Sequence, residues 1–239
     1  MRSHPHSRQF QRTTLQRTVI PLIFGIAGFA VLISLGNWQL HRLEWKEAIL
    51  SDINEKIAGE PVELPGLPNE EAHKYLSVAA TGIFRQDALR ILVSRREIGA
   101  GYLIVSPFET GGRAILVQRG FLKIEDELRP PSGGRTTVTG NLHWPDDRNG
   151  STPENDIEGN LWFARDLAQM ASAVNAEPVL LIARETTRPE PSLDMFPIDA
   201  ADVPNDHLEY AVTWFLLAMV WAGMTAYYMY RVFRIRQGE

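Results

Sequence analysis

Two long apolar segments, one near each end of the chain, are the clearest pattern along the sequence. Residues 19–35 and residues 211–230 contain no charged side chain. An α-helix rises about 1.5 Å per residue, so a segment of roughly 20 apolar residues can cross the ~30 Å hydrocarbon core of a bilayer. Trp214 and Tyr228 lie toward opposite ends of the second segment, at depths that amphipathic rings favour. The pattern predicts transmembrane helices over residues 19–38 and 207–230.

Each segment also has an alternative interpretation. The first could be a secretory signal peptide, but it is long for that purpose and no clear Ala-x-Ala cleavage site follows it. The arginine-rich, acid-free start has the composition of a mitochondrial presequence, although it is short for one. The second segment could be the buried helix of a soluble protein, but arginines follow it directly. Two membrane anchors explain both segments best.

Between the two segments the period of the apolar positions changes. Over residues 40–58 they recur at three- and four-residue spacing, which predicts a helix that continues the first span as far as Gly59. Short runs rich in Val, Ile, Leu and Thr follow, separated by Gly or Pro, and these are typical of strands. The predicted strands cover residues 75–84, 89–94, 102–108, 114–119, 136–142 and 179–183.

Asp166 is placed to cap a short helix over residues 167–174, and a proline-containing polar linker over residues 185–206 leads back to the membrane. The predicted fold class is therefore a membrane protein. Two transmembrane helices, N- and C-terminal, flank an α+β outer domain with an antiparallel β-sheet or small barrel.

Charge is divided unevenly along the chain and sets the expected topology. Residues 1–18 carry four arginines and no acid, residues 231–239 carry three arginines and one acid, and the rest carries 17 basic and 28 acidic residues. Because basic flanks stay on the cytoplasmic side, we expect cytoplasmic tails over residues 1–18 and 231–239 and an outer domain over residues 39–206. This suits a multi-pass protein of the bacterial inner membrane with a periplasmic domain, or of the mitochondrial inner membrane in a eukaryote. The acidic middle speaks against nucleic acid as a partner.

Several kinds of chemistry are excluded by what the sequence lacks. The chain has no cysteine, which rules out disulfides, thiolate metal sites and thiol nucleophiles. No motif of serine hydrolases, zinc peptidases or nucleotide-binding loops occurs. Asp146 and Asp147 could form a carboxylate pair, but adjacent acids on a loop are more typical of a solvated turn. We therefore expect no enzyme and no catalytic residue.

Histidine provides the remaining candidate chemistry. His41 and His207 each lie at the outer end of a predicted span, where a titratable ring is costly enough to need a reason. Aromatic residues share a helical face with His207, and aromatic residues share a face with an arginine just after the first span. These candidate binding residues are His207, Tyr210 and Trp214 on the second span, and Trp38, Arg42 and Trp45 on the first.

Such a set could hold a flat amphiphilic ring such as haem. The imidazole of His207 would bind the iron, and the guanidinium of Arg42 would meet a propionate. The alternative is that these residues only anchor the helices at the membrane interface, with tryptophan at the headgroups and arginine reaching toward water.

The sequence also resembles a known family, the surfeit-locus assembly factors of cytochrome c oxidase. The resemblance runs nearly from end to end, through motifs that occur in the family's order. They are LGNWQ (residues 35–39) with Arg42, Trp45 and Lys46; GIF (82–84); GY (101–102) with PF (107–108); LVQRGF (116–121); NLWFARD (160–166); and PNDHLEYA (204–211) with TWF (213–215).

This resemblance implies a non-enzymatic role in the respiratory chain, the delivery or stabilisation of haem a during its insertion into the catalytic subunit of an aa3-type oxidase. It implies His207 as the transient haem ligand, the oxidase catalytic subunit as partner, and the haem a synthesis enzyme as a possible further one. The alternative within the same family is a scaffold that holds the nascent subunit without binding haem. Glu209 departs from the family pattern, which often has glutamine there.

Overall fold

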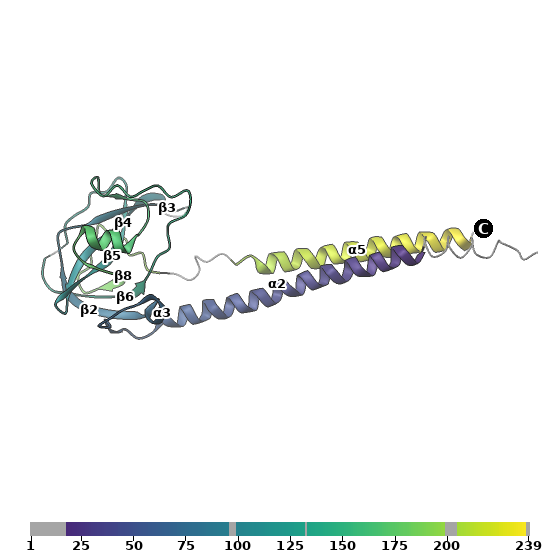
Figure 1. Ribbon diagram of the computed structural model, residues 1–239, viewed down its shortest axis with the longest axis horizontal. Helices are drawn as coiled ribbons and strands as arrows, with labels where there is room; N and C mark the ends of the chain where they lie inside the picture. Colours follow the sequence, from purple (N-terminus) through teal and green to yellow (C-terminus); the bar gives the residue numbers. More distant parts are fainter. Residues whose placement is uncertain (1–17, 96–98, 132, 199–204, 238–239) are drawn as a thin grey trace, which may run out of the picture. The chain divides into compact units, whose positions relative to one another are not determined.

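The computed structural model describes residues 18–95, 99–131, 133–198 and 205–237 (Figure 1). The chain divides into two compact units: Met1–Leu50 with Ala201–Glu239, and Ser51–Ala200. Nearly all of the predicted basic tail over residues 1–18, and the last two residues of the C-terminal tail, lie outside the described residues. The two units are described separately below.

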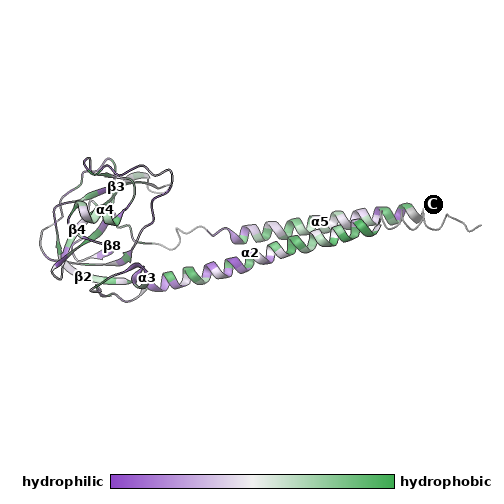
Figure 2. Cartoon of the chain, in the orientation of Figure 1, coloured by the Kyte–Doolittle hydropathy of each residue, from purple (hydrophilic) through white to green (hydrophobic). Residues whose placement is uncertain are grey.

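The first unit contains α5 (His207–Gln237) and α2 (Ile20–Ala58) as far as Leu50. Both are long and apolar enough to cross a membrane, which confirms the two predicted spans. Figure 2 shows mainly hydrophobic residues along α5 and the first part of α2, and more hydrophilic residues in the later part of α2. The first span and the helix predicted after it form one uninterrupted helix, because no proline or glycine pair breaks the segment before Gly59.

Small residues bring the two helices together along an antiparallel seam. Gly25 faces Thr225, Gly28 faces Trp221 and Gly36 faces Phe215. From one facing pair to the next, the residue number increases on α2 and decreases on α5, so the two helices are antiparallel. A Cβ atom at Gly36 would come within 2.5 Å of the Phe215 ring. The indole Nε1 of Trp221 donates to the carbonyl of Gly25 at 2.8 Å. Close backbone approach at glycine is the usual way in which membrane helices pack without a hydrophobic driving force.

The second unit is a small barrel domain with appended strands and two short helices. Five strands form a closed ring in which each pairs with the next, in the order β2–β6–β8–β5–β4 and back to β2. Strand β3 pairs with β4, β7 with β3, and β1 with β2. The elements are β1 (Val62–Glu63), α3 (Glu70–His73), β2 (Ser77–Phe84), β3 (Leu89–Arg95), β4 (Gly99–Thr110), β5 (Arg113–Lys123), β6 (Thr136–His143), β7 (Leu161–Trp162), α4 (Leu167–Ala173) and β8 (Glu177–Thr186).

This arrangement confirms the predicted β-domain and shows that it is a barrel. Most pairings are antiparallel, but β8 lies parallel to β5, as do β1 to β2 and β7 to β3. The ring closes at Gly82, which pairs with Thr136 of β6 on one side and with Thr110 of β4 on the other. A side chain at Gly82 would collide with the backbone of Glu109, so the closure needs a glycine there.

Strands β5 and β8 are buried on both faces and separate two hydrophobic clusters. Alternate residues such as Val117 and Leu181 belong to a cluster inside the barrel, with Phe108 and Val138. Their neighbours belong to a second cluster that also contains Trp162 and Met170 and is covered by α4. Burial on both faces explains why β8 reads as a continuous apolar run rather than an alternating one. The predicted cap is present, since Asp166 Oδ1 accepts from the Gln169 amide at 3.1 Å.

The segment after β8 is not a free linker throughout. The amide and carbonyl of Phe121 both pair with Asp194, at 2.7 and 2.9 Å. The Gln118 side chain also donates to the carbonyl of Phe196 at 3.3 Å. The proline content of this region correctly predicted irregular structure, but the backbone of Phe121 and the side chain of Gln118, both on β5, bond to it at Asp194 and Phe196.

Candidate functional site

The candidate site is built around His207, the first residue of α5. Its ring nitrogen Nδ1 lies 2.8 Å from the side-chain oxygen Oε1 of Gln39 on α2. Because Oε1 carries no hydrogen, Nδ1 donates the bond. Among the residues that the structure describes, no hydrogen bond is made to the other ring nitrogen, Nε2. One nitrogen of the half-buried ring is thus held by the protein, and the other is available.

Gln39 is a polar residue in the seam between the two helices. It is 9 % exposed and follows Gly36, which packs on Phe215, by one helical turn. On the facing helix Ala211, one turn beyond His207, is buried at 1 % exposure. The Gln39–His207 contact therefore lies at the end of the glycine- and alanine-rich seam, where α5 begins.

The predicted aromatic residues of the first span lie outside this seam. Trp38 and Trp45 are 58 % and 51 % exposed on α2. The guanidinium carbon of Arg42 lies 3.9 Å from the centre of a Trp45 ring, a cation–π contact within one helix. His41, the other interfacial histidine, is exposed, and its Nδ1 bonds to the carbonyl of Asn37 at 2.8 Å within the same helix.

On α5 the predicted residues are distributed around the helix. Tyr210 is 58 % exposed, whereas Trp214 is half-buried. Among the six candidate binding residues, the structure records a direct contact only for the Arg42–Trp45 pair within its described part. The residue that does contact His207 is Gln39, which sequence reasoning did not select. The sequence did contain a sign of this role: Gln39 continues the three- and four-residue spacing of Gly25, Gly28 and Gly36, and so lies on the helix face that meets α5.

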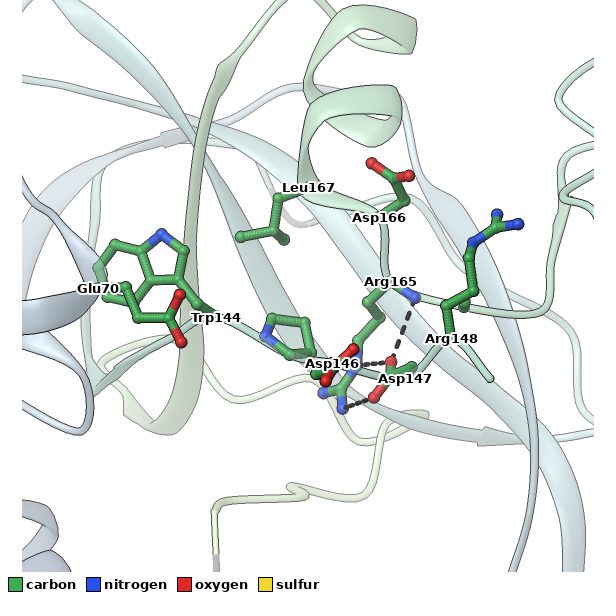
Figure 3. A pocket seen from close by; sticks show the side chains of 10 residues that line it. Glu70, Trp144, Asp146, Asp147, Arg148, Arg165, Asp166 and Leu167 are labelled. Carbon is green, nitrogen blue, oxygen red and sulfur yellow. Dashed lines mark hydrogen bonds and ion pairs between the residues drawn. The ribbon is translucent and has the colours of Figure 1, made fainter. Parts of the chain in front are cut away.

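The barrel domain has a polar pocket of its own, of about 450 Å³, shown in Figure 3. Trp144, Leu167 and Asp146 line it, and an ion pair between Asp147 and Arg165 lies along its floor. Two guanidinium nitrogens of Arg165 bond the two carboxylate oxygens of Asp147 at 2.6 and 2.9 Å. A third nitrogen donates to Gln118 Oε1 at 3.1 Å. The adjacent acids Asp146 and Asp147 do not act as a pair, since Asp147 is engaged by Arg165 and Asp146 is exposed.

Two groups beside this pocket have shifted pKa values. Burial, together with the positive charges of Arg165 and Lys74, lowers the pKa of His143 to about 4. Burial alone would raise the pKa of Asp147, but the hydrogen bonds and charge of Arg165 outweigh it and lower that pKa. At neutral pH His143 is therefore uncharged and Asp147 is ionised. No group of three or more potential metal-binding side chains occurs among the described residues.

Comparison with known proteins decides the family. The sequence pattern of the SURF1 family matches residues 26–219. The chain belongs to the SURF1 family. A SURF1-like protein of Drosophila melanogaster is 33 % identical over 227 residues, covering 84 % of this chain and 74 % of that protein. The SURF1-like protein of the bacterium Rickettsia felis is 30 % identical and covers 85 % and 93 % of the two chains. Human Surfeit locus protein 1 is 30 % identical, with 83 % and 73 % covered.

These matches confirm the resemblance to the surfeit-locus family, and with the two apolar helices they make this SURF1 protein membrane-anchored. The SURF1 match begins within α2 and ends within α5. It therefore includes the whole barrel domain as well as both partners of the Gln39–His207 contact.

Proposed function

We propose that this protein is an assembly factor of an aa3-type cytochrome c oxidase that binds haem a transiently through His207 and passes it to the catalytic subunit. It would act at the bacterial inner membrane, or the mitochondrial inner membrane in a eukaryote. In that setting the barrel domain lies on the periplasmic side and both termini on the cytoplasmic side, because the terminal segments are rich in arginine. The role is not enzymatic.

One observation carries the proposal: Nδ1 of His207 is bound by Gln39, while Nε2 has no hydrogen-bond partner among the described residues. Histidines that bind metals are usually held in this way, with one ring nitrogen donating to a protein oxygen and the other bound to the metal. A histidine that served only to anchor a helix at the interface would not need a buried glutamine from another helix.

The candidate side chains at the start of α5 and in the middle of α2 are of the kinds that bind a haem. His207 would bind the haem iron, and haem iron is commonly held by a single histidine. Exposed rings of Trp38, Trp45 and Tyr210, with half-buried Trp214, offer flat apolar surface, and Arg42 offers a guanidinium suited to a propionate carboxylate. When bound, the haem would supply an iron that can accept a nitrogen ligand; this chain would supply the imidazole and its orientation.

A carrier must also release what it binds. His207 is the only histidine on the described part of α5, and His41, the nearest one along α2, has its Nδ1 engaged by its own helix backbone. A single histidine ligand in a half-buried position favours transfer over permanent retention. The partner is the oxidase catalytic subunit, and the enzyme that makes haem a is a possible donor.

The alternative is a scaffold that holds the nascent catalytic subunit and binds no haem. The barrel interior is filled by side chains such as Phe108, Ile115 and Leu142, so it offers no room for a cofactor and would serve as a contact surface. Both functions use the same membrane helices, so cofactor binding by the purified protein separates them.

The test is the absorption spectrum of the full-length protein, purified in detergent after co-expression with the enzymes that make haem a. Wild type, His207→Ala and His41→Ala are compared. His41 is the matched control, since it also lies at the outer end of a predicted span, but its Nδ1 bonds within α2. We expect a haem a band in wild type and His41→Ala, and a large loss in His207→Ala.

Two results would contradict the proposal. Equal bands in all three proteins would remove His207 as the ligand. The absence of a band in every protein, with the oxidase subunit still co-purifying, would support the scaffold function instead. Membrane insertion is checked in parallel by extraction and gel analysis, because loss of the whole protein in His207→Ala would indicate that the histidine anchors the helix.

A further inference from the structure

We infer that Gln39 is a positioning residue that fixes the tautomer of His207, with the proton on Nδ1 and the lone pair on Nε2. The inference rests on the proposed function only for its consequence, haem binding; the tautomer itself can be measured without haem. It assigns a role to a residue on α2 that contacts no cofactor and acts through its neighbour.

The geometry of the contact determines the direction of the hydrogen bond. The Gln39 oxygen and the His207 Nδ1 are 2.8 Å apart, a normal length for a hydrogen bond. A carbonyl oxygen can only accept, so Nδ1 must carry the hydrogen. A neutral imidazole has one hydrogen on its two nitrogens, and Nε2 is then left with a free lone pair. Histidine in water prefers the opposite tautomer, so this one needs an acceptor placed by the protein.

The surroundings of Gln39 hold that acceptor in place. Its side chain is almost entirely buried, in a seam where glycine allows the two helices to approach closely. A buried amide without a hydrogen-bond partner is destabilising, because it has lost its bonds to water. Gln39 therefore gains by keeping the contact, and rotation of its side chain away from His207 is opposed by the same packing that brings the helices together.

Among the described residues, no neighbour of His207 on its own helix accepts a hydrogen bond from the ring. Asp206 and Glu209 flank it, but both are exposed and neither bonds the ring within the described residues. The backbone carbonyls of these two residues accept hydrogen bonds from their own helix, that of Asp206 from the Tyr210 amide and that of Glu209 from the Thr213 hydroxyl. The orientation of the ring thus depends on the other helix.

An amide is a milder acceptor than a carboxylate, and this matters for a carrier. Metal-binding histidines are often paired with carboxylates, which raise the basicity of the ligand nitrogen. With a neutral amide the ring is oriented but not made strongly electron-donating. Orientation without strong activation suits a ligand that must later let the haem go.

The test is nitrogen NMR of the full-length protein, labelled with ¹⁵N-histidine and purified without haem at a pH where His207 is neutral. The ¹⁵N shifts of a neutral ring separate the nitrogen that carries hydrogen from the one that does not. The variants are Gln39→Leu, which cannot accept a hydrogen bond, and Gln39→Glu, which accepts more strongly. The His207 signals are assigned by their loss in His207→Ala.

The chain contains its own reference signals. Nδ1 of His41 bonds the carbonyl of Asn37 at 2.8 Å, so His41 should show hydrogen on Nδ1 in every variant. Nδ1 of His73 accepts from the backbone amide of Asn69 at 3.1 Å, so His73 should show the opposite tautomer in every variant. Constant signals from these two rings also show that each variant has kept its fold.

We expect His207 to carry its hydrogen on Nδ1 in wild type and in Gln39→Glu, and to shift mainly to the Nε2-hydrogen tautomer in Gln39→Leu. The hydrogen on Nε2 in wild type, or an unchanged His207 in Gln39→Leu, would overturn the inference. In the haem experiment, Gln39→Leu should weaken retention roughly 10-fold or more, the usual effect of removing the partner of a metal-binding histidine, and Gln39→Glu should restore it.

The two proposals can fail separately. A correct tautomer with no haem band in wild type would overturn the carrier function while leaving the role of Gln39 intact. A haem band that depends on His207 but is indifferent to Gln39→Leu would leave the carrier function intact and remove Gln39 from it.

Discussion

Arg119 of β5 and Glu190 form an ion pair inside the barrel domain. The Arg119 side chain is 2 % exposed, and its Nε donates to Glu190 Oε1 at 3.0 Å, with a second guanidinium nitrogen on the other oxygen. A third nitrogen donates to the hydroxyl of Ser106 at 3.2 Å. The pair holds the segment that follows β8 against β5, next to the backbone pairing of Phe121 with Asp194.

Removing the acid of this pair should be costly. Glu190→Ala leaves the Arg119 guanidinium buried with no opposite charge, facing only the neutral Ser106 hydroxyl and the Phe84 ring, and an uncompensated buried charge typically costs about 3–5 kcal/mol. We expect the free energy of unfolding of the barrel domain, measured by urea titration and near-UV circular dichroism, to fall by about that amount. Glu185→Ala, an exposed acid on β8, is the control and should change it by less than about 0.5 kcal/mol. Equal effects of the two variants would show that the Arg119–Glu190 pair contributes no more to stability than an exposed acid does.

The barrel should lose stability as the medium becomes acidic, through His143. Its pKa is about 4 in the folded domain and 6.5 ordinarily, so the unfolded chain binds this proton more tightly. Above pH 6.5 the neutral ring makes its full contribution to the free energy of unfolding. That contribution is lost as the pH falls from 6.5 to 4, and it does not change further below pH 4. The loss amounts to roughly 3 kcal/mol.

His143→Phe tests this pH dependence, because it keeps a ring near Tyr75, whose ring centre lies 5.6 Å away, and removes the titration. The free energy of unfolding of both proteins is measured by urea titration at several pH values between 4 and 7. We expect the difference between wild type and variant to change in favour of the variant as the pH falls. A constant difference would mean that His143 does not titrate in this range.

The helix seam should tolerate no side chain at Gly36. A valine there would collide with the ring of Phe215, so the helices would separate next to the Gln39–His207 contact. We expect Gly36→Val to lose most of the haem a band. In the ¹⁵N spectrum, the hydrogen of His207 should shift mainly from Nδ1 to Nε2. Gly223→Val is the control, since a Cβ at Gly223 would meet nothing within 4 Å. Retention of both signals in Gly36→Val would show that the contact does not depend on the seam.

Arg42 provides a test of the propionate contact. Its guanidinium lies over Trp45, an arrangement that would serve either a carboxylate ligand or simple anchoring at the membrane interface. We expect Arg42→Leu to speed the loss of haem during gel filtration several-fold, and Arg42→Lys, which keeps the charge, to have a smaller effect. Unchanged retention in Arg42→Leu would remove Arg42 from the site and leave it as an interfacial anchor.

The strands were predictable because their pattern is local. The segment expected at residues 136–142 is β6 (Thr136–His143), and the one at residues 89–94 is β3 (Leu89–Arg95). The closure of the ring was not predictable in the same way. It depends on Gly82 meeting two strands at once, and on β8 lying parallel to β5, which are relations between distant segments that leave no periodic trace. The two-residue strands β1 and β7 are too short to show any period.

In the candidate site, too, the locally unusual residue was predicted and its distant partner was not. His207 was found because a histidine at the end of an apolar helix is unusual at that depth. Gln39 was not found, because a glutamine is ordinary on a helix until its partner on another helix is known. Three glycines at the spacing of the seam were the available sign that this face of α2 meets a second helix.

The Gln39–His207 contact joins residues that are 168 positions apart. The site can therefore form only near the end of synthesis of the chain. At translation rates of about 5–20 residues per second, Gln39 is made on the order of ten seconds before its partner. The whole barrel is synthesised in the interval. If His207 binds haem as proposed, a chain that stalls or is cut before α5 would carry a complete barrel but would lack the proposed ligand, and we expect it to bind no haem.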